Sequence, residues 1–101
     1  MEWPELPEEV VLYGIHYPIR LVRDLSASDH RYGETNYYRH EISIDAALPL
    51  AVKWATLCHE VLHVIDGALT LGLKEDTVRR LDSGIFEFLS QLGIGGSHGN
   101  C

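Results

Sequence analysis

The sequence predicts a single α+β domain built from a small sheet of three or four strands, mixed or antiparallel, and two main helices. Up to residue 44, short runs alternate apolar and polar residues or are rich in β-branched and aromatic residues, as strands are. From residue 50 onward, apolar residues recur at the three- and four-residue spacing of helices. The chain has 101 residues, which is enough for one modest hydrophobic core.

Residues 10–23 predict one or two strands. Residues 10–17 are β-branched and aromatic, and Pro18 is expected to end or bend this run. Residues 19–23 alternate apolar and basic side chains, which is typical of a half-buried strand.

Residues 24–35 contain many Ser, Asp and Gly residues and are expected to form a hairpin loop. Residues 36–44 alternate again and predict another strand, with Tyr38, Ile42 and Ile44 on one face.

The first helix is expected to run from residue 50 at least to residue 66. Asp45 can cap it and Pro49 is tolerated in a first turn. Either Gly67 or Gly72 can end it, and the sequence leaves both open.

A second helix is expected over residues 75–92, followed by glycines that end it. Its apolar residues at helical spacing are Val78, Leu81, Ile85, Phe88, Leu89 and Leu92. The domain is therefore expected to span residues 1–94, and residues 95–101 have the composition of a flexible tail.

The composition, with 46% hydrophobic and 23% charged residues, is that of a soluble globular protein. A net charge of −7 argues against nucleic acid or an anionic membrane as the main partner. The sequence shows no apolar run of membrane-spanning length, and its acidic start does not resemble a signal peptide. Cys58 lies inside the first helix and Cys101 is the last residue, so reduced thiols are expected. These features predict a cytoplasmic protein.

The first helix contains His59-Glu60-Val61-Leu62-His63, which matches the zinc-hydrolase motif His-Glu-x-x-His. Two histidines four residues apart lie on one helical face, so both imidazoles can reach one metal ion. Glu60 flanks that ion and can take a proton from a water that the metal acidifies. The alternative is an amphipathic helix with incidental histidines. The surrounding residues are mostly apolar, however, so three polar side chains among them need partners.

A catalytic zinc ion needs a third protein ligand. One extended motif would require glycine at position 66 and a ligand at 69, but these positions hold Asp66 and Leu69. The inward face of the second helix is expected to comprise positions 75, 78, 82, 85, 89 and 92. Glu75 and Asp82 fall on that face, whereas Asp76 and Glu87 are expected to be solvated.

The residues leave the choice of third ligand open. Glu75 can instead interact with the helix dipole, and Asp82 can be either a ligand or a hydrogen-bond acceptor behind one. Asp66 lies in line with His59 and can steady the site or be solvated at the helix end.

Residues 59–66, 71–78 and 81–85 resemble small phage and bacterial metallopeptidases of the ImmA/IrrE type, and also minimal gluzincins of about a hundred residues. The resemblance covers residues 42–92 and implies a minimal zincin-like domain, with an active-site helix and a glutamate-bearing helix. It further implies that Glu75 completes a zinc site with His59 and His63. The chain departs from the family at Asp82, where relatives carry a small residue.

The sequence thus predicts a zinc-dependent peptidase, acting on peptide or protein substrates, with Glu60 as the general base. The substrate is expected to pair with residues 36–44 as an edge strand. The alternative is a non-catalytic, metal-stabilised protein-binding module. In the tail, His98 and Cys101 are further possible zinc ligands that would keep the enzyme latent, although chance placement is the favoured explanation.

Overall fold

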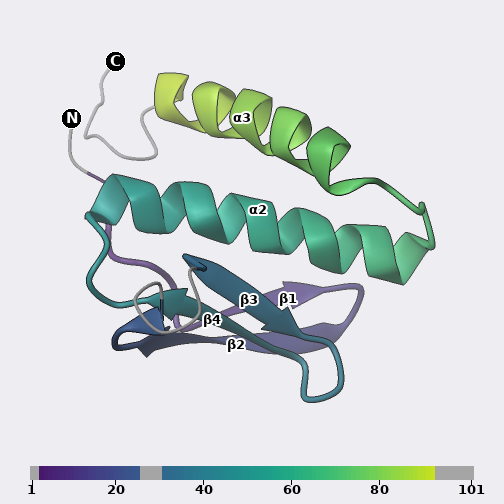
Figure 1. The fold of residues 1–101 in the computed structure, drawn as a ribbon, viewed down its shortest axis with the longest axis horizontal. Coiled ribbons are helices and arrows are strands. Elements are labelled where there is room, and N and C mark those ends of the chain that lie inside the picture. The colour runs from purple at the N-terminus through teal and green to yellow at the C-terminus, as the bar shows by residue number, and fades with distance from the viewer. Residues whose placement is uncertain (1–2, 26–30, 93–101) are drawn as a thin grey trace.

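The computed structural model describes residues 3–25 and 31–92 and arranges them in layers (Figure 1). A sheet forms one side, α2 lies across it, and α3 lies on the far side of α2. The elements are β1 (Glu9–Leu12), β2 (Ile15–Val22), β3 (Gly33–Asn36), β4 (Glu41–Asp45), α2 (Leu50–Leu69) and α3 (Glu75–Gln91). The predicted α+β class, with a small mixed sheet and two helices, is confirmed for the described residues.

The sheet has the strand order β1-β2-β4-β3. β1 pairs with β2 and β3 pairs with β4 in antiparallel orientation, whereas β2 and β4 run parallel, with Ile19 opposite Ile42 and Val22 opposite Asp45. β2 and β4 are therefore inner strands, and β1 and β3 are the two edge strands. α2 packs against both β3 and β4.

The hydrophobic core lies between the sheet and α2. Ile42 and Ile44 alternate along β4 and are fully buried, and Tyr17 of β2 joins them. Leu57 and Val64 cover them from α2. Each fully buried side chain of this size contributes about 1.5–3 kcal/mol, so this face fixes how α2 sits on the sheet.

Pro18 does not end the first strand region, as the sequence suggested, but lies inside β2 opposite Glu9. The backbone N–H of Ile19 donates to the carbonyl of Glu8, on the β1 side of the sheet. The nitrogen of Pro18 therefore faces the other side, where pairing with β4 begins only at Ile19. No ladder hydrogen bond is lost, which is why proline is tolerated there.

The predicted strand over residues 36–44 is wrong as a single element. Residues 37–40 form a turn between β3 and β4, and Tyr38 is 96% exposed rather than in the core. The burial of Ile42 and Ile44 is confirmed. The expected hairpin loop over residues 24–35 is also wrong at its end, because Gly33 already belongs to β3 and β3 pairs with β4, not with β2.

α2 begins where the sequence predicts, but its caps differ from the prediction. Asp45 is buried at the end of β4, where its Oδ1 accepts a hydrogen bond from the N–H of Ala47, and the N-cap is Pro49. Neither predicted glycine ends the helix. α2 continues through Gly67 to Leu69, and Thr70 adopts the left-handed conformation that ends it.

α3 matches the predicted second helix to within one residue, and its predicted inward face is confirmed in part, because Asp82 and Leu89 are half-buried whereas Ile85 and Leu92 are exposed. Val78 is fully buried as expected, and Phe86 stacks on Trp3 with ring centroids 4.9 Å apart. The apolar residues of α3 that remain exposed are Leu81, Ile85, Phe88 and, just beyond it, Leu92. Within the described residues, neither α2 nor α3 is long and apolar enough to cross a membrane.

Gly33 sets how closely β3 approaches α2. A Cβ there would lie 2.6 Å from Cγ2 of Thr56 and 3.0 Å from the carbonyl oxygen of Ser43. Gly33→Ala is therefore expected to lower the free energy of unfolding by about 1–3 kcal/mol, measured by urea denaturation.

The matched control is Gly84→Ala in α3, where an added Cβ meets nothing within 4 Å. That change is expected to raise the free energy of unfolding by about 0.5–1 kcal/mol, because glycine weakens a helix interior. Equal stability of Gly33→Ala and the wild-type protein would contradict this close packing.

Candidate metal centre

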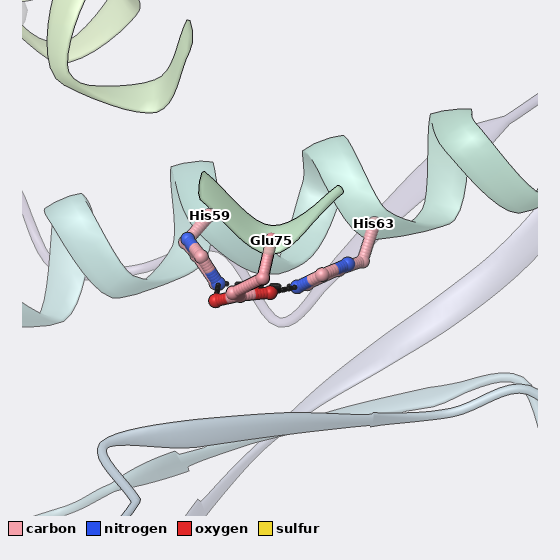
Figure 2. Close-up of side chains that lie close together, drawn as sticks. All are labelled: His59, His63 and Glu75. Carbon is pink, nitrogen blue, oxygen red and sulfur yellow. Dashed lines mark hydrogen bonds and ion pairs between the residues drawn. The ribbon is translucent and has the colours of Figure 1, made fainter. Parts of the chain in front are cut away.

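His59, His63 and Glu75 come together between α2 and the start of α3 (Figure 2). Nε2 of His59 lies 2.9 Å from Oε2 of Glu75, and Nε2 of His63 lies 3.0 Å from Oε1 of the same carboxylate. The two Nε2 atoms are 3.1 Å apart. The carboxylate lies between the two rings, and one donor atom from each residue falls within 4.8 Å of the others. This group could hold a metal ion.

The spacing of these donors suits a small ion. Zinc binds nitrogen and oxygen ligands at about 2.0–2.2 Å in tetrahedral geometry, which separates neighbouring donors by about 3.3 Å. The observed separations of 2.9, 3.0 and 3.1 Å need to widen only slightly. Two imidazoles and one carboxylate are also a donor set that zinc accepts in catalytic sites.

Asp82 is a partner of His59 rather than a member of the donor group. Its Oδ2 lies 2.5 Å from Nδ1 of His59, on the side of the ring away from Glu75. A neutral His59 that donates its Nδ1–H to Asp82 keeps the Nε2 lone pair for a metal ion. A metal ion on Nε2 would therefore leave the contact between Nδ1 and Asp82 in place.

Glu75 reaches the histidines although α2 continues past Gly67 to Leu69. From His63 to Leu69 the helix advances about 9 Å, and the extended residues 71–74 can cover that distance in return. Asp66 fixes this return: its Oδ1 accepts the N–H of Leu73 at 2.9 Å, and its carbonyl accepts the N–H of Leu71. Asp66 is thus outside the donor group and is not simply solvated: it anchors the segment that positions Glu75.

Glu60 points from α2 toward the edge strand and is only 6% exposed. Its Oε1 accepts a hydrogen bond of 2.7 Å from Oγ1 of Thr35 in β3. This contact holds a buried carboxylate beside the histidines without making it part of the donor group. The sequence analysis does not identify Thr35, because residue 35 falls in the expected hairpin loop.

A pocket of about 760 Å³ opens over the donor group. Along one side lie residues of β3 and its flanks, so the strand beside the site is β3 and not the predicted 36–44 segment, whose second half is the inner strand β4. Arg79 of α3 also lines the pocket and forms an ion pair with Glu75 at 3.4 Å. The lining residues are Arg31, Tyr32, Gly33, Glu34, Thr35, Tyr37, Val52, Ala55, Thr56, His59, Glu60, His63, Glu75, Arg79 and Asp82.

Tyr37 is a second lining residue that the sequence did not single out. It lies in the turn after β3, and burial raises the pKa of its phenol; the charges of Glu60, Asp66 and Glu75 add to this effect. The hydroxyl therefore stays protonated at neutral pH. The tail residues His98 and Cys101 lie outside the described residues.

Comparisons with protein-family models, with curated proteins and with solved structures found no match for this chain. The resemblance to ImmA/IrrE-type metallopeptidases and minimal gluzincins therefore stays a prediction that rests on the motif residues themselves.

Proposed function

We propose that this protein is a zinc-dependent peptidase. The observation that carries the proposal is the position of Glu60: a buried carboxylate, held by Thr35, beside a group of two histidines and a glutamate. A purely structural zinc site has its coordination filled by protein ligands and has no use for a free carboxylate at that place. The predicted zincin-like character and a cytoplasmic location belong to the same proposal.

His59, His63 and Glu75 would hold the metal ion. Zinc, when bound there, supplies a Lewis acid that polarises the amide carbonyl and acidifies the attacking water. Glu60 has one oxygen occupied by Thr35, while its Oε2 makes no hydrogen bond within the described part of the chain. That oxygen takes a proton from the attacking water and then passes it to the leaving nitrogen.

The substrate would bind along β3. Among residues 3–25 and 31–92 this strand pairs only with β4, so the N–H and C=O groups on its outer side can pair with another strand. An extended peptide can add there and lie across the pocket, with its scissile amide above the donor group. The substrate class is therefore an extended peptide or an unfolded segment of a protein.

The test measures zinc content and peptide hydrolysis on the same samples. Purified protein loaded with zinc is incubated with a mixed library of peptides, and the products are identified by mass spectrometry. We expect one zinc ion per chain, and cleavage that stops when a chelator removes the metal and returns when zinc is restored.

The same measurement separates the two candidate functions. A stoichiometric zinc ion without cleavage of any peptide in the library would favour the non-catalytic, metal-stabilised binding module. Absence of bound zinc would contradict both.

A further inference from the structure

The ring of Tyr37 lies over α2 in line with the two histidines. Positions 59, 63 and 67 follow one another on the same face of the helix, one turn apart. At position 67 the helix has glycine, and a Cβ there would lie only 3.3 Å from Cε1 of Tyr37. The tyrosine ring thus occupies the space that a side chain would fill, about 6 Å along the helix from His63.

The hydroxyl of Tyr37 is free to donate. It forms no hydrogen bond with any residue in 3–25 or 31–92. Most other side-chain donors that line the pocket are engaged, and Tyr32 is the other phenol there. Thr35 donates to Glu60, and Thr56 donates to a backbone carbonyl. Arg31 is paired with Glu34, and Arg79 with Glu75.

Hydrolysis of an amide through attack by water places negative charge on the carbonyl oxygen. As the new C–O bond forms, the electron pair of the C=O double bond moves to oxygen, while Glu60 holds the proton from the water. A neutral donor aimed at that oxygen lowers the barrier, because its hydrogen bond strengthens as the charge develops.

We propose that the Tyr37 hydroxyl donates a hydrogen bond to the carbonyl oxygen of the scissile amide as that oxygen becomes negatively charged. The inference deepens the proposed peptidase function and rests on it. It makes Tyr37 a catalytic residue supplied by the turn between β3 and β4, on the far side of the donor group from Asp82.

Three variants test the role: Tyr37→Phe, Tyr38→Phe and Tyr32→Phe. Tyr38 is the adjacent residue, 96% exposed, and does not line the pocket, so its variant is the matched control. Tyr32 lines the pocket, so its variant tests the rival phenol. The probe is a phosphinic tetrapeptide, Ala-Ala-Ala-Ala with –PO₂⁻–CH₂– in place of the central amide, titrated by calorimetry into zinc-loaded protein.

Tyr37→Phe is expected to weaken binding of the phosphinic peptide about 100-fold and to lower kcat by about 10²–10³ with little change in KM. Zinc affinity should be unchanged. Tyr38→Phe should match the wild-type protein in all three measurements, and Tyr32→Phe should lose much less affinity for the phosphinic peptide than Tyr37→Phe does.

The proposal is overturned if Tyr37→Phe binds the phosphinic peptide as tightly as wild type does, or if Tyr32→Phe shows the loss instead. It is equally overturned if Tyr37→Phe loses zinc affinity together with affinity for the phosphinic peptide, because the phenol would then be a metal ligand. It is also overturned if the wild-type protein has no affinity for the phosphinic peptide. If the wild-type protein binds the phosphinic peptide but cleaves no peptide, the peptidase function alone is contradicted. The affinity of Tyr37→Phe for the phosphinic peptide still decides whether Tyr37 is the hydrogen-bond donor.

Discussion

Glu60→Gln is expected to bind one zinc ion per chain with nearly wild-type affinity and to hydrolyse peptides about 10² to 10⁴ times more slowly than the wild-type protein. Glutamine has the shape of glutamate, and its carbonyl oxygen can still accept the hydrogen bond from Thr35. The other end of the side chain is then an NH₂ group. That group cannot accept a proton from the attacking water.

This substitution separates chemistry from folding and from metal binding. Glu60 is almost fully buried, but its one hydrogen bond within the described residues is that from Thr35, which the amide preserves. The free energy of unfolding should therefore change little, and zinc should still raise the melting temperature. The measurements are initial rates on a peptide found in the library, zinc content, and thermal unfolding with and without zinc.

Glu87→Gln in α3 removes the same charge at an exposed position away from the pocket and serves as the control. It should behave as wild type. Hydrolysis by Glu60→Gln at the wild-type rate would show that Glu60 is not the general base, even if the protein is a peptidase.

The sequence predicts those residues of the site that lie on the single helix α2. His59, Glu60 and His63 are neighbours within a single turn, so their spacing alone places them on adjacent faces of α2. The same holds for the alternation of Ile42 and Ile44, whose burial is confirmed. Local periodicity needs no knowledge of the rest of the fold.

The arrangement of the strands could not be predicted in the same way. β2 and β4 pair in parallel although β3 lies between them in the sequence, so neighbours along the chain are not neighbours in the sheet. This non-local pairing moves residues 41–44 inside the sheet and leaves β3 beside the pocket. Thr35 can be recognised as a partner of Glu60 only once this strand order is known.

The register of α3 on α2 likewise depends on contacts that are distant in sequence. Phe86 turns inward because it stacks on Trp3, near the other end of the chain, and this rotates Ile85 toward solvent. The link that returns to the site is held by Asp66, a residue whose sequence context fitted a solvated helix end equally well. The helical periodicity of α3 therefore identifies Glu75 and Asp82 as candidates, but it cannot decide which of them is the third metal ligand.

Alanine substitutions are expected to rank the residues of the candidate metal centre by their distance from the ion. His59→Ala and His63→Ala should abolish zinc binding, because each removes one of three protein ligands. Glu75→Ala should weaken zinc binding more than 100-fold. Asp82→Ala should weaken it by about 10- to 100-fold, since Asp82 acts only through Nδ1 of His59.

Asp76→Ala is the matched control, because Asp76 adjoins Glu75 but has an exposed side chain paired with Arg80 at 3.2 Å. It should keep wild-type zinc affinity. Zinc affinity is measured by competition with a chromogenic chelator, and thermal unfolding gives an independent reading. At a free zinc concentration one hundred times Kd, binding stabilises the wild-type fold by about 2.7 kcal/mol, and this gain should vanish in both histidine variants.

The comparison of zinc affinity between Glu75→Ala and Asp82→Ala is the most decisive, because the two side chains contact different nitrogens of the same imidazole. If Nε2 of His59 binds the metal, Glu75 shares the ion and Asp82 only orients the ring. A larger loss of zinc affinity in Asp82→Ala than in Glu75→Ala would mean that the ion sits on the Nδ1 side. His63 could then not reach it from its present position, since its Nε2 faces Nε2 of His59 at 3.1 Å. That result would replace the proposed ligand set of His59, His63 and Glu75.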